Sequence, residues 1–296
     1  MEARANGRKR PVKRAGLKPY LFILPELLFA LVFVYYPFFR TFLYSFSAVN
    51  FMGEITSFAG TENYRYLFSR REFAAALGNT LRLTAMNVPL TVILTLALGR
   101  LLKEKRFMNG LFETMIAATM AVSMGSAALT FRVLLNPTVG WLNQALGITV
   151  RWYEDRSTAM YGILLLTVWM GIGFNFLLFL SAFRGVDGDV TDSARLDGAG
   201  PLRVFFSVEL PLISPTVVYV VCTNAILALM TSGPVLILTQ GGPARSTTTL
   251  IYLMYTMGYG SGNYAAAAWV AAVTFALTLG FTLLSLWADG KRRDGR

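Results

Sequence analysis

Histidine is absent from this chain of 296 residues, and cysteine occurs only once, as Cys222. Without histidine the chain lacks the commonest general base, proton relay and metal ligand of proteins. A single cysteine excludes an intrachain disulfide bond. Cys222 lies inside an apolar segment, which is typical of a small buried hydrophobic residue. Histidine-based catalysis and a disulfide-stapled fold are therefore excluded.

Charged residues are also scarce, at 15% of the sequence, against about 25% in an ordinary soluble domain. Hydrophobic residues make up 55% of the chain. The net charge is nevertheless +11. No loop interleaves basic residues with exposed aromatics, so we expect contact with anionic lipid head groups and no nucleic-acid partner.

Long apolar runs dominate what is present. About 20 apolar residues in a helix cross a bilayer core of about 30 Å. The second run is the weakest, because Arg82 and Arg100 interrupt it. The pattern predicts an all-α, polytopic membrane protein with six transmembrane helices, and a soluble core of six such helices is the less favoured alternative. The six segments are 20–39, 77–102, 111–131, 161–183, 212–238 and 263–287.

Basic residues predict the orientation of these helices. Eighteen lysines and arginines lie in or beside the tail 1–18, the loop after the second span, the loop 184–211 and the tail 288–296, and seven lie in the remaining loops. The positive-inside rule then places both termini and the 184–211 loop in the cytoplasm. The expected organisation is a basic N-tail (1–18), one transmembrane domain (19–287) and a C-tail (288–296). The first apolar run is too long for a signal peptide and should stay in the membrane.

The 184–211 loop is the one sizeable polar stretch between long apolar runs. Asp189 is expected to cap a helix that begins at Val190, with Asp192 in the position of the acidic residue of a capping box. This helix should end near Asp197, because Gly198 can adopt the left-handed conformation.

A second short helix should follow. Pro201 suits its first turn, and Leu210-Pro211 should end it. Leu202, Phe205 and Phe206 are spaced to share one face. Two interpretations of that face stay open: it packs against a partner protein, or it folds back on the chain's own helix ends.

The loop resembles the cytoplasmic signature of binding-protein-dependent ABC importer permeases, which reads Glu-Ala-Ala, three variable residues, Gly, and later Leu-Pro. Here the pattern stands as Asp192-Ser193-Ala194, Asp197-Gly198-Ala199, Phe206 and Leu210-Pro211. Aspartate and serine replace the usual glutamate and first alanine. Flanking features are similar to the carbohydrate and glycerol-3-phosphate branch, namely Gly60-Thr-Glu-Asn-Tyr64, Asn136-Pro137, Gly241-Gly-Pro243 and Thr247-Thr-Thr-Leu-Ile251.

The resemblance implies a transport subunit of the cytoplasmic (inner) membrane of a prokaryote. Its implied partners are a second permease subunit (a paralogue in this branch), two ATPase subunits and an extracytoplasmic solute-binding protein. ATP and Mg²⁺ would be held by the ATPase, because this chain has no G-x-x-x-x-G-K-[ST] loop. No cofactor or metal is expected on the chain itself. The implied ATPase-coupling residues are Asp192, Ala194, Asp197, Gly198, Ala199, Phe205, Phe206, Leu210 and Pro211.

Polar and aromatic residues inside the spans are candidates for the solute path, although each one serves helix packing more often than transport. Gly233-Pro234 should break the fifth span at membrane depth, and broken helices are tolerated where they line a cavity. The candidates are Asn175, Asn224, Thr231, Ser232, Gly233 and Trp269.

Two other classes of function remain as alternatives. A stand-alone secondary transporter or channel would need an ion or proton site inside the bundle. A membrane enzyme would need paired acids near the interface, and Asp187, Asp189, Asp192 and Asp197 do cluster in sequence. Helix capping explains that cluster more simply.

Overall fold

The computed structural model describes residues 18–50, 52–104 and 106–294. Most of the basic N-tail and the last two residues therefore lie outside the described residues. The chain divides into two units, one up to Leu43 and one from Tyr44 onward.

The first unit is a continuous apolar helix. It comprises α1 (Lys18–Ala30), a π-helical turn η1 (Leu31–Tyr35) and most of α2 (Tyr36–Ser45). The 25 residues from Leu21 to Ser45 are long and apolar enough to cross a membrane, and their most apolar stretch buries none of its residues inside the chain. A helix that is apolar all round and unburied needs lipid or another protein around it.

The second unit opens with a β-hairpin, which the all-α expectation did not include. β1 (Ser47–Val49) and β2 (Ile55–Phe58) pair antiparallel, with Ser47 opposite Phe58. The Asn50 side chain closes the turn, because its carboxamide oxygen accepts hydrogen bonds from the backbone of Met52 and Glu54. Asparagine favours such turns, so a polar loop of this kind can fold back as two short strands.

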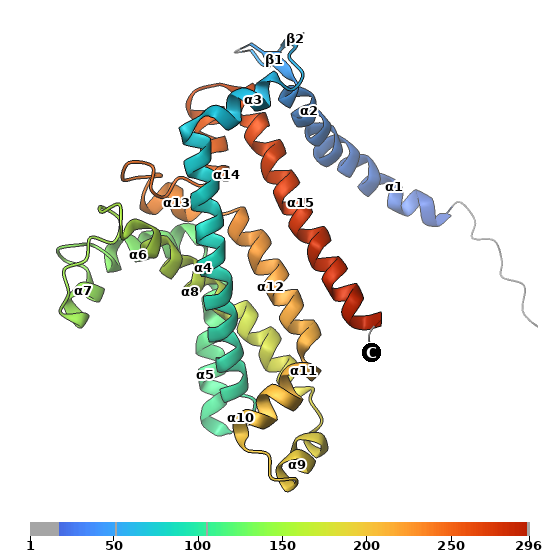
Figure 1. The fold of residues 1–296 in the computed structure, drawn as a ribbon, viewed down its shortest axis with the longest axis vertical. Helices are drawn as coiled ribbons and strands as arrows, with labels where there is room; N and C mark the ends of the chain where they lie inside the picture. The colour runs from blue at the N-terminus through green and yellow to red at the C-terminus, as the bar shows by residue number, and fades with distance from the viewer. Residues whose placement is uncertain (1–17, 51, 105, 295–296) are drawn as a thin grey trace, which may run out of the picture. The chain divides into compact units, whose positions relative to one another are not determined.

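Three helices form the centre of the second unit (Figure 1). α3 (Glu62–Ser69) leads into α4 (Arg71–Leu101), which packs along α8 (Ala159–Arg184) and against α12 (Ser214–Leu229). At 31 residues α4 is about 46 Å long, enough to cross a bilayer. The last turn of α4 lies tight against α8, since a Cβ on Gly99 would stand 2.9 Å from Cβ of Phe179.

The third predicted span, 111–131, is not one straight helix. α5 (Phe107–Ala117) and a 3₁₀ turn η2 (Ala118–Ala121) meet α6 (Met124–Leu134) at 105°. Ser123 is extended and caps α6, its hydroxyl accepting from the Ser126 amide, so the chain turns at this point. The arm from Met108 to Ala121 is only about 21 Å long, shorter than a bilayer core of about 30 Å.

The fifth predicted span, 212–238, is broken as expected. α12 ends at Leu229, and α13 (Gly233–Leu238) begins after a gap of three residues, with Pro234 in its first turn. α13 packs on α6. A Cβ on Gly233 would lie 2.1 Å from Cε of Met124, so the two interrupted helices meet where both are broken.

The remaining helices complete the second unit. α7 (Trp141–Leu146) follows α6, and α14 (Leu250–Tyr255) precedes a π-helical turn η4 (Thr256–Gly260) and α15 (Tyr264–Asp294). Leu250 and Leu253 are buried, and α14 packs against α15 and α4. The Thr80 hydroxyl of α4 accepts from the Leu250 amide at 2.9 Å.

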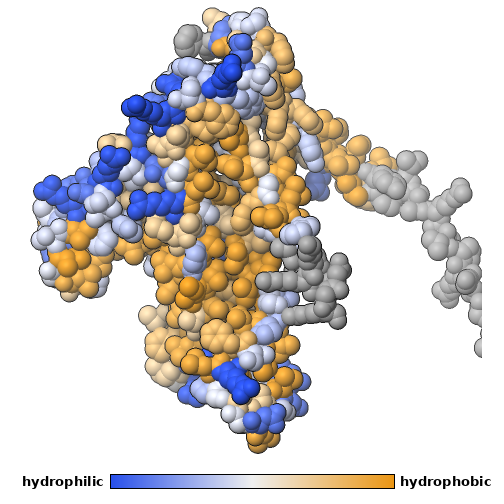
Figure 2. Space-filling view, viewed as in Figure 1, coloured by the Kyte–Doolittle hydropathy of each residue, from blue (hydrophilic) through white to orange (hydrophobic). Residues whose placement is uncertain are grey.

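Four helices are long and apolar enough to span a membrane, and six spans result if each of two bent helix pairs counts as one. Figure 2 shows apolar residues along the length of the central helices and hydrophilic residues gathered toward the two ends. Within the described residues the helical membrane fold is thus confirmed. The four are Leu21–Ser45, Arg71–Leu101, Ala159–Arg184 and Tyr264–Trp287, and the bent pairs are Met108–Ala121 with Met124–Leu134 and Pro201–Leu212 with Ser214–Leu229.

Candidate functional site: the 184–211 loop

The 184–211 loop folds into two short helical arms between α8 and α12 (Figure 1). The first arm is α9 (Gly188–Leu196). The second arm runs through α10 (Pro201–Val204), a π-helical turn η3 (Phe205–Glu209) and α11 (Leu210–Leu212). The second arm meets α12 at 74°.

The first arm begins two residues earlier than the sequence pattern indicated. Asp187, not Asp189, is the cap, and its carboxylate accepts from the Asp189 amide at 3.0 Å. Asp189 then falls in the first turn, where its charge favours the helix N-terminus. Asp192 is too far along α9 for a capping box and instead pairs with Arg195 at 3.0 Å, with both side chains exposed.

The turn between the arms is the one that the sequence predicted. Gly198 has φ +83°, in the left-handed region. The Ala199 amide donates to the Ala194 carbonyl, and the Gly198 amide donates to the Arg195 carbonyl, both at 3.0 Å. These two bonds form a Schellman motif that ends α9 at Asp197. A Cβ on Gly198 would meet no atom within 4 Å, so the backbone conformation alone demands glycine.

The second arm begins at Pro201 as expected and ends one residue after Pro211, at Leu212. Leu202, Phe205 and Phe206 line the same cleft, as their spacing predicted, but their burial differs. Phe205 packs against the cluster around Phe183, whereas Leu202 and Phe206 are 69% and 62% exposed.

The loop therefore has two faces. The inner face, formed by Val204, Phe205 and Glu209, lies against the chain's own helices, with Val204 and Glu209 each 1% exposed. The outer face carries three large apolar side chains in the open. They are Leu196, Leu202 and Phe206, exposed by 89%, 69% and 62%. Exposed large apolar side chains on a polar loop are candidates for a protein contact.

Ion pairs hold the inner face to α4. Arg100, in the last turn of α4, donates to the Glu209 carboxylate at 2.8 Å, and Lys103 pairs with the other Glu209 oxygen. Sequence reasoning missed this contact, although an acid next to Leu210-Pro211 in an otherwise apolar run was a usable signal. Arg184 at the end of α8 adds a pair with Glu113 of α5.

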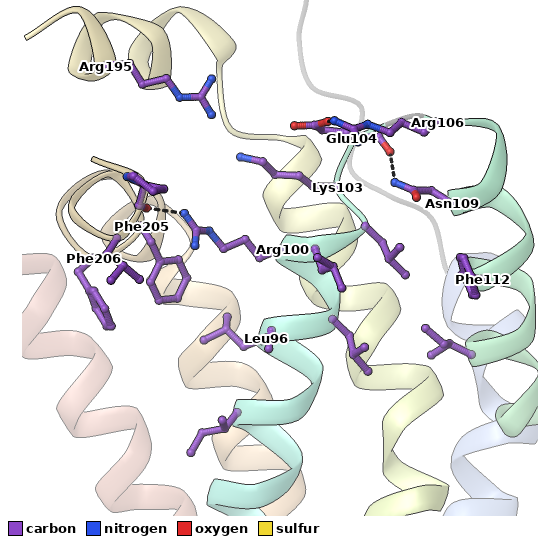
Figure 3. Close-up of a pocket in the computed structure, with 18 residues that line it drawn as sticks. Leu96, Arg100, Lys103, Glu104, Arg106, Asn109, Phe112, Arg195, Phe205 and Phe206 are labelled. Carbon is purple, nitrogen blue, oxygen red and sulfur yellow. Dashed lines mark hydrogen bonds and ion pairs between the residues drawn. The ribbon is translucent and has the colours of Figure 1, made fainter. Parts of the chain in front are cut away.

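A cleft of about 1040 Å³ separates these elements. Figure 3 shows α4 between the second arm and α5, and all three line the cleft, the arm with Phe205 and Phe206 among others. The cations Arg100, Lys103, Arg106 and Arg195 stand at one end of it, and apolar side chains such as Leu96 line the rest.

The predicted solute-path residues separate into two groups. Asn175 of α8 and Asn224 of α12 bond to each other in both directions, at 3.1 and 3.0 Å, and both are buried. Each amide also donates to a carbonyl four residues earlier in its own helix. The pair is therefore satisfied as a link between α8 and α12.

The other candidates lie near the broken fifth span or in α15. The Thr231 carbonyl accepts from the Thr249 hydroxyl at 2.7 Å. The Met124 side chain packs directly against Gly233. Ser232 is half-buried beside the break. Trp269 packs on the cluster around Leu250, and its buried indole N–H has no hydrogen-bond partner within the part of the chain that the structure describes.

Among residues 18–50, 52–104 and 106–294, no group of three or more Cys, Asp or Glu side chains is placed to hold a metal ion.

Comparison with known proteins decides the family. The profile of the "Binding-protein-dependent transport system inner membrane component" family matches residues 18–290. This chain belongs to that family. The permease is similar along its length to the sn-glycerol-3-phosphate transport system permease protein UgpA of Pectobacterium atrosepticum, at 31% identity over 93% of this chain and 95% of the relative. It is 29% identical to UgpA of Escherichia coli, over 96% of this chain and 98% of the relative.

Solved structures confirm the fold of the permease. A chain from the crystal structure of a bacterial ABC transporter involved in the import of the acidic polysaccharide alginate superposes with a TM-score of 0.80 at 19% identity, covering 93% of this chain and 95% of that one. A chain of the bacterial alginate ABC transporter in complex with an alginate pentasaccharide-bound periplasmic protein gives 0.77 at 20% identity, over 90% and 92%. The permease is thus a multi-pass inner membrane component of a binding-protein-dependent transport system.

Proposed function

We propose that this permease is one of two membrane-spanning subunits of an importer in the inner membrane of a prokaryote, driven by separate ATPase subunits. The other membrane subunit is a paralogue, and a solute-binding protein delivers the solute from outside. ATP and Mg²⁺ are bound by the ATPase. The observation that carries the proposal is the two-faced 184–211 loop, which fixes one face to the transmembrane helices and leaves Leu196, Leu202 and Phe206 open.

The exposed face is the ATPase contact in this proposal. Phe206 and Leu202 enter an apolar groove on the ATPase, while Asp192 and Asp197 at the tip pair with basic groups there. Gly198, with Ala194 and Ala199, keeps the angle between the arms. Phe205, Leu210 and Pro211 serve the coupling from the inner side, by joining the arm to the helices that move. In this proposal the loop and both termini lie in the cytoplasm, the side that the positive-inside pattern favours.

The transported solute is a sugar, an oligosaccharide or a glycerol-3-phosphate-type compound. UgpA relatives carry the name of a glycerol-3-phosphate system, and the structural neighbours belong to an alginate system. The solute path is proposed to run beside the broken fifth span, at Thr231, Ser232 and Gly233. Trp269 is included as a partly buried aromatic residue whose ring can stack on a sugar ring, while its indole N–H is buried. Asn175 and Asn224 take part by holding the walls together.

Purification from a strain that co-expresses the neighbouring transport genes tests the proposal. The ATPase is expected to co-purify, and reconstituted vesicles are expected to take up solute only with ATP and the binding protein. A permease that purifies without an ATPase, or that takes up solute alone along an ion gradient, would instead be a stand-alone secondary transporter or channel. Screening candidate solutes for retention by the cognate binding protein identifies the cargo.

A further inference from the structure

One side chain of α4 contacts the second arm of the loop at three points. Nη2 of Arg100 donates to the Pro201 carbonyl at 2.6 Å. Its guanidinium lies 4.6 Å from the centre of the Phe205 ring. Its Nε donates to the Glu209 carboxylate at 2.8 Å. Figure 3 shows Arg100 reaching from α4 toward Phe205.

The three contacted residues are spaced by four along the chain, so they form one stripe on the arm. A contact at a single point would let the arm pivot about Arg100. Contacts with Pro201 at the start, Phe205 in the middle and Glu209 near the end resist both rotation and sliding of the arm. The planar guanidinium suits this task, because it can donate several hydrogen bonds and stack on an aromatic ring at the same time.

Glu209 is the least replaceable part of the contact. Its side chain is 1% exposed, and both carboxylate oxygens are occupied, one by Arg100 and one by Lys103. A buried ion pair adds little stability over an apolar pair of equal volume, and its best-attested use is to fix register. The pair thus points to a need for a defined position of the arm on α4.

The α4 side of the Arg100 contact is held rigidly. Arg184 of α8 donates to the Leu102 and Lys103 carbonyls, which directly follow the end of α4. Gly99 lets the same turn of α4 approach the α8 backbone closely. The turn that carries Arg100 is therefore fixed to α8, so a displacement of the second arm has to move α4 and α8 together.

We propose that Arg100 and Glu209 form the internal link that carries the movement of the 184–211 loop into α4 and α8. The inference rests on the proposed coupling function of the loop and assigns positioning residues to it. Leu202 and Phe206 contact the ATPase on the outer face and are displaced when the ATPase moves. Arg100 and Glu209 transmit that displacement to the transmembrane helices.

The test uses the whole transporter in vesicles, with uptake and ATP hydrolysis measured on the same preparation. In Arg100→Gln and in Glu209→Gln, the ATPase is expected to remain bound, and the solute taken up per ATP hydrolysed is expected to fall about tenfold. The double variant is expected to lose less than the product of the two single losses, because the Arg100–Glu209 pair is common to both substitutions. Glu104→Gln and Arg106→Gln, which affect an exposed ion pair nearby, are matched controls. In both, the solute taken up per ATP hydrolysed should equal that of wild type.

The outcomes separate the two proposals. Uptake per ATP within twofold of wild type in Arg100→Gln, or losses in the double variant that multiply, overturns the link. Failure of the wild-type complex to show ATP-dependent uptake overturns the coupling function itself. If Arg100→Gln does not reach the membrane, Arg100→Lys decides, because lysine keeps one charge but cannot make three contacts. Wild-type coupling in that variant also overturns the link.

Discussion

The two arms of the 184–211 loop are held in place by different means. The first arm, α9, is fixed by its own neighbours in sequence: the Asp187 cap at one end and the Gly198 turn at the other. The second arm is fixed by residues about a hundred positions away, through Arg100 and Lys103. Locally stabilised segments open at low free-energy cost, whereas segments tied to the core open with it. The first arm is thus suited to adapt to a partner and the second to transmit its movement.

The largest expected effect comes from the turn that joins the arms. Gly198→Val forces a β-branched residue to φ +83°, at a cost of about 1–3 kcal/mol. The arms then change their angle, and ATP-driven uptake is expected to fall more than about tenfold, with membrane insertion unchanged. Uptake assays on vesicles with equal permease content measure this. Gly198→Asn is the matched control, since asparagine tolerates the left-handed region, and equal losses in both variants would contradict the explanation.

The next prediction distinguishes the outer face of the loop from its inner face by comparing ATPase binding with thermal stability. Leu202→Ala combined with Phe206→Ala is expected to weaken ATPase binding by about 2 kcal/mol or more while leaving thermal stability unchanged, because both side chains are exposed. Phe205→Ala should do the reverse: it removes packing against Phe183, with a loss of about 2 kcal/mol in stability. Titration of the ATPase onto purified permease, beside thermal unfolding, distinguishes them. Equal effects of the two changes on stability would refute the two-face description.

A smaller effect tests the local hold on the first arm. Asp187→Ala removes the cap of α9, which costs about 1 kcal/mol. Amide hydrogen exchange in Gly188–Leu196 should become about fivefold faster, while exchange in the second arm stays the same. Asp189→Ala removes only a first-turn charge and should have an effect of about 0.3 kcal/mol. If both arms were to exchange faster in Asp187→Ala, the arms would be one cooperative unit.

The smallest effect on the isolated chain concerns Asp192. Its pair with Arg195 is exposed on both sides, so Asp192→Ala should change stability by no more than about 0.5 kcal/mol. A role in the ATPase contact would show as weaker ATPase binding at unchanged stability. Binding measured at low and high salt checks this, because an exposed contact is screened. Unchanged affinity at low salt would remove Asp192 from the coupling set.

Sequence alone was sufficient for much of the fold and for the position of the loop. Helix ends governed by single residues were predicted within about two positions, as at Gly198 and Pro201, because φ preferences act locally. The bend at Ser123 was missed, since an apolar run reads the same whether it is straight or turned by 105°. The β-hairpin was missed because its strands are short and its closing residue, Asn50, lies in a polar loop.

The amino-acid sequence by itself determined the class of molecule and the positions of local turns. Its apolar runs require lipid around them, and Gly198 requires a turn. Only the tertiary structure decided which side of the second arm is free. Phe205 and Phe206 are neighbours of the same type, yet one packs on α4 and α8 while the other remains exposed. Burial depends on the elements that surround a residue, and contacts such as Arg100 with Glu209 join residues too far apart in the chain for any local pattern to reveal.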